Sequence, residues 1–191
     1  MSLLASVQGL LRLLQQHGAH GCLVGGLAVS VRCDPRFTLD ADVAVAVVND
    51  AEAEACVRLL VQAGYVVAAT AEQQAVGRLA MVRFLESTGT SIDILFASSG
   101  IEHDIVVESE RLEVVPGLVL PVARVGHLIA MKLLSVAPGR ETDAADLRHL
   151  AGVADAVEWQ RAEAAVEAIL ARGYGRDRPL AADLAALRRS V

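Results

Sequence analysis

Asp40 and Asp42 stand two positions apart at the start of a run of valines and alanines. Alternate residues of a strand point to the same face, so a strand here would present two carboxylates side by side. Neighbouring carboxylates repel each other and are costly to remove from water, and a divalent cation is the simplest compensation. Oxygen ligands of this kind suit Mg²⁺, which keeps waters and substrate phosphates in its coordination shell. The pair therefore predicts a magnesium site.

A third acid, Asp93, lies alone in the apolar segment 91–96. A buried carboxylate needs a partner, and the three acids would converge if the strand of Asp93 lay beside that of Asp42. Two metal ions about 4 Å apart could then hold the attacking and leaving oxygens of an in-line phosphoryl displacement. The simpler interpretations are acids that cover a strand entrance, for Asp40 and Asp42, and a solvent-facing position for Asp93.

A pair of glycines, Gly25 and Gly26, separates an expected strand from an expected short helix. Without a Cβ, these residues would let the backbone approach a triphosphate closely. The helix that follows would offer N–H donors and the positive end of its dipole to the phosphates. Two cations, Arg32 and Arg36, lie between the glycines and the acids. Such a glycine pair is a weak signal by itself, and its weight comes from the acids that follow.

Taken together, these motifs resemble the signature of the polymerase-β-like nucleotidyltransferase superfamily: Gly25-Gly26, thirteen further residues, Asp40-Ala41-Asp42 and a later Asp93. Within that superfamily the chain looks like the AbiEii-type (MenA-like) nucleotidyltransferases. The residues that carry this closer likeness are the run from Pro35 to Asp42, Lys132, and the pair Asp143 and Asp146. The resemblance covers approximately residues 20–150.

This resemblance implies a mixed sheet flanked by helices, two Mg²⁺ ions and an NTP, such as ATP, as the donor of a nucleoside monophosphate. It implies that Asp40 and Asp42 bind metal and that Asp93 is a third ligand or the base for the acceptor hydroxyl. The phosphate-binding residues implied are Gly25, Gly26, Arg36, Thr38 and Lys132, with Lys132 also part of the catalytic set. Asp143 and Asp146 would support the site by holding Lys132.

The resemblance also implies possible partners. The acceptor would be RNA, such as tRNA, or a protein, and the chain would be the toxin of a toxin–antitoxin pair with a cognate antitoxin. The alternatives are a nucleotidyltransferase that modifies a small molecule such as an antibiotic, or an inactive module that only binds NTP. The residues allow simpler interpretations too: Lys132 as a solvated lysine on an apolar helix, and Asp143 and Asp146 as acids that complement a helix dipole.

Composition sets limits on the kind of protein. The chain has 191 residues, of which 54% are hydrophobic, and a formal net charge of −6. This size predicts one compact domain, and the negative charge argues against a protein that coats DNA. The apolar runs are too short to span a membrane, and the first sixteen residues lack the features of a signal peptide, so we expect a cytoplasmic protein. Three cysteines without metal-ligand spacing are expected to be small buried residues: Cys22, Cys33 and Cys56.

Periodicity and turn residues predict the elements that must position these side chains. Helices are expected over 1–16, 27–32, 51–63, 125–136, 142–150, 157–171 and 180–189. Strands are expected over 21–24, 42–48, 65–68, 79–86, 91–97, 111–115 and 118–122. The fold class is therefore α+β, with a mixed-sheet core at 1–122 and a helical C-terminal region at 123–191. Five arginines make that region basic, either as a solvated helical end or as an RNA contact: Arg172, Arg176, Arg178, Arg188 and Arg189.

Overall fold

A computed structural model describes residues 3–33, 38, 40–86, 89–137 and 141–191. Its strands are β1 (Gly21–Val24), β2 (Asp40–Val45), β3 (Val66–Gln73), β4 (Arg78–Leu85), β5 (Ser91–Leu95), β6 (Glu110–Val115) and β7 (Leu118–Val122). Its helices are α1 (Leu3–Gln16), α2 (Gly25–Arg32), α3 (Asp50–Gln62), α4 (Glu102–Val107), α5 (Val125–Ser135), α6 (Glu141–Val153), α7 (Ala156–Ala171) and α8 (Leu180–Arg189).

The strands form one mixed sheet in the order β3-β4-β5-β2-β1-β7-β6. The central strand β2 is parallel to β5 and antiparallel to β1, while β4 is antiparallel to β5. The hairpin of β6 and β7 joins the sheet through a single parallel pairing of β7 with β1. The α+β fold with a mixed sheet is therefore confirmed.

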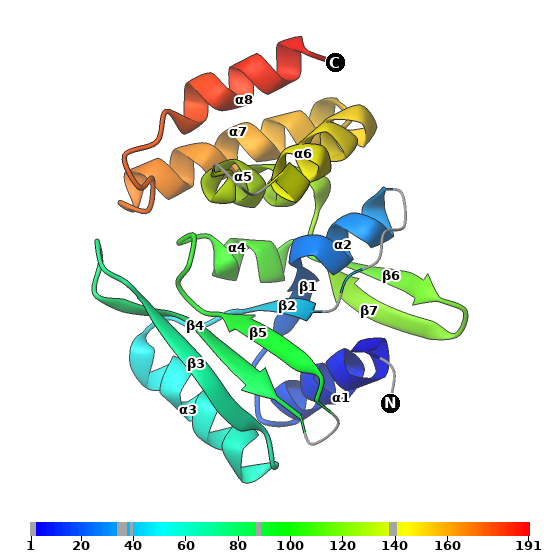
Figure 1. The fold of residues 1–191 in the computed structure, drawn as a ribbon, viewed down its shortest axis with the longest axis vertical. Helices are drawn as coiled ribbons and strands as arrows, with labels where there is room; N and C mark the ends of the chain where they lie inside the picture. The colour runs from blue at the N-terminus through cyan, green and yellow to red at the C-terminus, as the bar shows by residue number, and fades with distance from the viewer. Residues whose placement is uncertain (1–2, 34–37, 39, 87–88, 138–140) are drawn as a thin grey trace.

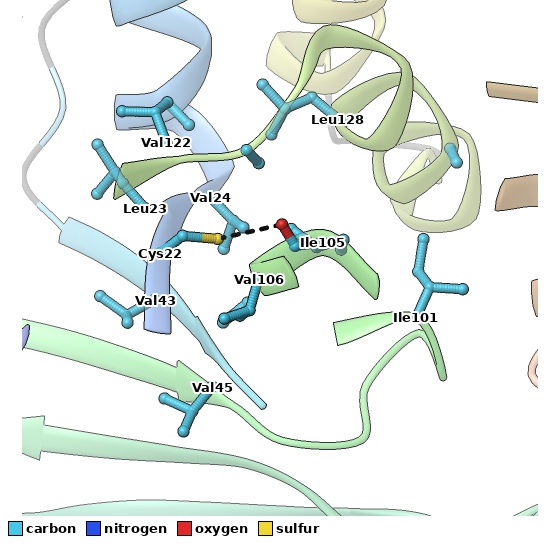
Figure 2. Close-up of a cluster of buried hydrophobic side chains, with 14 of the residues drawn as sticks. Cys22, Leu23, Val24, Val43, Val45, Ile101, Ile105, Val106, Val122 and Leu128 are labelled. Atoms are coloured by element: carbon cyan, nitrogen blue, oxygen red, sulfur yellow. Dashed lines mark hydrogen bonds between the residues drawn. The ribbon is translucent and has the colours of Figure 1, made fainter. Parts of the chain in front are cut away.

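The two faces of the sheet are covered by different helices (Figure 1). A Cβ at Gly21 would meet Leu11 of α1, so this position faces α1. The next residue, Cys22, points the other way, and its thiol contacts the carbonyl oxygen of Ile105 in α4. Figure 2 shows this contact among the branched side chains of β1, β2 and α4. Strand alternation thus divides β1 and β2 between an α1 face and an α4 face.

Helices α5 to α8 form a layer over the α4 face (Figure 1). Helix α5 is the centre of this layer because Leu128, Ile129 and Ala130 are all buried. Gly126 lets α7 approach closely, since a Cβ there would lie 2.3 Å from the carbonyl oxygen of Glu158. Among the described residues, none of the helices combines the length and the apolar character needed to cross a membrane.

Most expected elements are present, with shifted ends. Helix α2 begins at Gly25 rather than at residue 27, so the glycine pair forms its first turn and not a separate loop. Strand β2 begins at Asp40 and ends at Val45, so Asp40 is itself a strand residue. Helix α4 was not expected. Cys22 and Cys56 are buried as predicted, and Cys33 is half-buried.

Candidate active site

The carboxylates of Asp42 and Asp93 lie on neighbouring strands. In the parallel pairing of β2 with β5, Asp42 is directly opposite Asp93, and Asp40 is opposite Ser91. Directly opposed residues share a face, so the three acids point to the α4 face. Asp93 is buried, Asp42 is half-buried and Asp40 is exposed. The expected neighbourhood of the two strands is confirmed, whereas the roles of the three acids stay predictions.

The glycine turn closes over Asp42. Gly25 has a φ of +63°, and a Cβ there would lie 1.9 Å from Oδ2 of Asp42. The adjacent Gly26 donates its backbone N–H to the Asp42 carboxylate. Glycine is needed at position 25 because any side chain would occupy the space of the carboxylate, in a backbone conformation that disfavours side chains. The glycine pair therefore fixes the position of the Asp42 carboxylate.

Burial raises the pKa of Asp42 to about 6, and the nearby charge of Asp93 acts in the same direction. The positive charge of Lys132 and the hydrogen bond from Gly26 oppose this increase in part. A bound cation would stabilise the ionised form of Asp42, which burial and the charge of Asp93 disfavour. The electrostatics of Asp42 therefore suit a cation-binding position.

Asp93 is held by Arg83, a residue that the sequence analysis did not name. Arg83 lies opposite Asp93 in the β4–β5 pairing. Its Nε donates to Oδ1 at 2.7 Å and its Nη2 donates to Oδ2 at 2.7 Å, which is the two-pronged geometry of a strong guanidinium–carboxylate pair. The hairpin register could have revealed Arg83, since Leu85 pairs with Ser91 and Arg83 is two residues further along.

Lys132 lies at the centre of a buried cluster with two acids. Its Nζ is 2.6 Å from Oδ1 of Asp143 and 2.7 Å from Oδ2 of Asp146. Lys132 comes from α5 and both acids come from α6, and all three are buried. Asp143 and Asp146 therefore do hold Lys132, as the resemblance implies. Asp143 also lies in the first turn of α6, as the simpler interpretation has it, and both acids are buried, at 3% and 1% exposed.

A pocket of about 420 Å³ brings these groups together. Its lining includes Gly25, Gly26, Asp42, Asp93, Lys132 and Arg176. A larger cleft of about 520 Å³ lies at the opposite ends of β1 and β2. That cleft is lined by Arg12, His20, His103 and Arg111, with no carboxylate among its described lining residues. We assign the candidate active site to the smaller pocket because cation chemistry needs the acids.

Arg36 and Thr38 are the other two residues predicted to bind phosphate. Arg36 lies outside the described residues. Thr38 is described, and its hydroxyl donates to the carbonyl oxygen of Asp40 at 3.1 Å, which ties it to the start of β2. Within the described part of the chain, no three histidine, cysteine, aspartate or glutamate side chains are arranged as a ready set of metal ligands. The structure thus brings Asp42 and Asp93 together, with Asp93 engaged by Arg83.

Comparison with solved structures relates the fold to known ones. An antigenic nucleotidyltransferase-like protein from Paracoccidioides brasiliensis matches with a TM-score of 0.52 and 16% identity, over 98% of this chain and 92% of that one. The antibiotic-resistance factor ANT(2'')-Ia matches with a TM-score of 0.54 and 16% identity, over 98% of this chain and 97% of that one. The chain has a nucleotidyltransferase fold.

A third match, at a TM-score of 0.49 and 14% identity, is the lincomycin-bound lincosamide antibiotic adenylyltransferase LnuA, which covers 78% of this chain and 97% of its own. No protein-family model and no curated protein matches the sequence. A nucleotidyltransferase fold at this level of identity speaks for the architecture, and function must be argued from the site.

Proposed function

We propose that this protein is a Mg²⁺-dependent nucleotidyltransferase that transfers a nucleoside monophosphate from an NTP to an acceptor hydroxyl. The observation that carries the proposal is the opposed pair Asp42 and Asp93, placed in one pocket with the glycine turn that begins α2. The nucleotidyltransferase fold supports the same activity. In this proposal Asp40 and Asp42 hold the metal, and Gly25 and Gly26 lie against the phosphates.

The donor set fits magnesium. Asp40 and Asp42 offer hard oxygen ligands on one face of β2. Burial, together with the charge of Asp93, raises the pKa of Asp42, and a bound cation would favour its ionised form. Bound Mg²⁺ would neutralise the phosphates and so favour departure of pyrophosphate. A second ion would need Asp93 as a ligand, and Asp93 would then have to share its oxygens with Arg83.

The residues of the chain account for the rest of the reaction. The acceptor oxygen attacks the α-phosphorus of the NTP, the bond from that phosphorus to the bridging oxygen breaks, and pyrophosphate leaves. In this proposal Asp93 would take the proton of the acceptor hydroxyl, since each of its oxygens keeps a second lone pair beyond the bond from Arg83. Arg83 orients this carboxylate. The N-terminal N–H groups of α2 would face the phosphates.

Two acceptor classes are proposed. The AbiEii-type resemblance favours RNA, such as tRNA, or a protein, and with it a role as the toxin of a toxin–antitoxin pair. The fold shared with ANT(2'')-Ia, an antibiotic-resistance factor, favours a small molecule that carries hydroxyl groups. The pocket volume of about 420 Å³ is suited to a nucleotide, so either acceptor would approach from outside it.

Labelled transfer tests this function. Each of the four NTPs, labelled at the α or at the γ phosphate, is incubated with Mg²⁺ and total RNA, a protein mixture or a panel of hydroxyl-bearing antibiotics. We expect one acceptor class to gain label from the α position and none from the γ position. Asp42→Asn should abolish the transfer while leaving the protein folded. Label gained from the γ position would identify a kinase instead. If NTP binds but no acceptor gains label, the protein is instead an inactive module that only binds NTP.

A further inference from the structure

Two consecutive residues of the connection between α7 and α8 have a left-handed backbone. Arg176 has a φ of +53° and Asp177 a φ of +54°, and they are the non-glycine residues with positive φ in the described part of the chain. This conformation is unfavourable for residues with a Cβ and persists only where the surroundings enforce it. Such positions concentrate at binding and catalytic sites. The need to reverse the chain between α7 and α8 therefore does not by itself explain why two residues adopt this unfavourable backbone conformation.

The surroundings of this connection enforce its shape from both ends. Tyr174 is buried against Gly100, where a Cβ would lie 2.4 Å from its Cδ2 atom. Arg172 donates to the carbonyl oxygen of Gly100 at 2.6 Å and pairs with Asp104 at 2.5 Å. On the other side, Arg178 donates to the carbonyl oxygen of Val136 after α5. These contacts fasten the connection to the segment between β5 and α4 and to the end of α5.

The anchored connection places Arg176 in the candidate active site. Its Nη2 donates to the carbonyl oxygen of Ser98 at 2.9 Å, and its side chain lines the same pocket as Asp42 and Asp93. Gly173 lies near Val76 of the β3–β4 turn, so the connection reaches over the end of that hairpin (Figure 1). A basic residue of the C-terminal helical region is thus brought beside the carboxylates of the sheet.

The charges in the pocket make the position of Arg176 important for binding an NTP. An NTP brings several negative charges into a pocket that already contains carboxylates. Lys132, the other basic residue among the described pocket lining, has its charge matched by Asp143 and Asp146. A guanidinium carries five N–H donors in a planar fork, which suits phosphate oxygens better than the point charge of an ammonium does. Arg176 is therefore the lining side chain best suited to meet a phosphate.

We propose that Arg176 binds the polyphosphate of the donor nucleotide, and that the strained connection exists to hold it there. This inference rests on the proposed function, because it assigns a ligand of the same pocket. It also gives the C-terminal helices a role in binding the donor. Three of the five tail arginines, Arg172, Arg178 and Arg188, pair with carboxylates of the fold.

Glycine substitutions separate this role from a structural one. Arg176→Gly removes the cation and relieves the left-handed strain, while Asp177→Gly relieves the same strain one residue later and keeps the cation. Titration calorimetry measures binding of ATP, GTP, CTP, UTP and inorganic tripolyphosphate with Mg²⁺. We expect Arg176→Gly to weaken the binding of the preferred NTP and of tripolyphosphate by roughly tenfold or more. Asp177→Gly should bind at least as tightly as the wild type.

Additional measurements distinguish a loss of phosphate binding from a loss of structure. Both glycine variants should melt within about 4 °C of the wild type, and Arg176→Lys should recover part of the lost affinity. The nucleoside without phosphates should bind the wild type and Arg176→Gly equally. Equal NTP affinity for the wild type and Arg176→Gly would overturn the inference, as would an equal loss for the nucleoside. A wild type that binds neither NTP nor tripolyphosphate would instead contradict the proposed function itself.

Discussion

At the scale of single residues, Asp42 sets the behaviour of the site with pH. Its pKa in the folded protein is about 6, above the ordinary value of 3.8, so the folded state binds the proton more tightly than the unfolded state. This contribution to stability is fully present below about pH 4 and is lost as the pH rises through about 6. In metal-free protein, the wild type should therefore lose up to about 3 kcal/mol relative to Asp42→Asn between pH 4 and 7.

The measurement is the free energy of unfolding of the two proteins in a chelator across that pH range. Added Mg²⁺ should restore the wild type at pH 7 and leave Asp42→Asn unaffected, because an ionised carboxylate binds the cation. Parallel stability curves for the two proteins would show that Asp42 titrates as an ordinary surface acid.

Arg83 and Asp93 should behave as a coupled pair. Arg83→Ala leaves a carboxylate whose side chain is only 10% exposed without two of its donors. Since Arg83 itself is 43% exposed, we expect a loss of about 1 to 2 kcal/mol of stability. A double-mutant cycle with Asp93→Asn, measured by urea unfolding, should give a coupling of about 1 kcal/mol. The exposed pair of Arg58 and Glu54 is the control, with a coupling near zero.

At the scale of elements, the start of α2 depends on a residue without a side chain. Gly25 and Gly77 share a φ of +63°, but a Cβ at Gly25 would collide with Asp42, whereas nothing lies within 4 Å of a Cβ at Gly77. Gly77→Ala should cost about 1 kcal/mol of stability from backbone strain alone. Gly25→Ala should cost at least about 2 kcal/mol more, because it also displaces a buried carboxylate and its hydrogen bond. Equal unfolding free energies for the two variants would contradict the close contact.

The elements also show what the sequence could and could not reveal. The β4–β5 hairpin and its turn were predictable, and counting its register from Leu85 and Ser91 leads to the pairing of Arg83 with Asp93. Helix α4 escaped because six residues are too few for a helical period. Ser99 donates to the buried Glu102 carboxylate from both its backbone N–H and its hydroxyl, but the N-cap of α4 is Ile101, so this Ser-x-x-Glu spacing does not mark the start of the helix.

Contacts between distant segments were beyond sequence reasoning from this one chain. The parallel pairing of β2 with β5 joins segments about fifty residues apart, and only the paired acids hinted at it. The position of Arg176 depends on how Tyr174 seats against Gly100, which no local pattern encodes. The resemblance to the nucleotidyltransferase signature was readable because most of its spacing is local: a glycine turn, a short helix and the acids of the next strand.

At the scale of the whole molecule, the helical layer contributes to the lining of the candidate active site. Helix α5 supplies Lys132 and the connection after α7 supplies Arg176, while the sheet supplies the acids. The junction of α5 with α7 depends on Gly126, whose Cβ would lie 2.8 Å from the backbone nitrogen of Ala162. Gly126→Ala should therefore cost about 2 kcal/mol or more of stability.

Gly152 in α6 is the matched control for that change, because nothing lies within 4 Å of a Cβ there. Gly152→Ala should stabilise the protein by about 0.5 to 1 kcal/mol, as alanine favours the helix. Thermal unfolding of both variants checks the contrast. A neutral Gly126→Ala would mean that α7 can shift away from α5 without cost, and the assignment of the helical layer to the active site would weaken with it.

The central claim is that the acids of β2 and β5 mark the place where a divalent cation and an NTP meet. A crystal structure with Mn²⁺ and a non-hydrolysable NTP tests it most directly, since the manganese can be located by its anomalous signal. We expect manganese bound by Asp40 and Asp42, with the triphosphate against Gly25 and one phosphate beside Arg176. Manganese and nucleotide found elsewhere, such as in the cleft of Arg12 and Arg111, would contradict it.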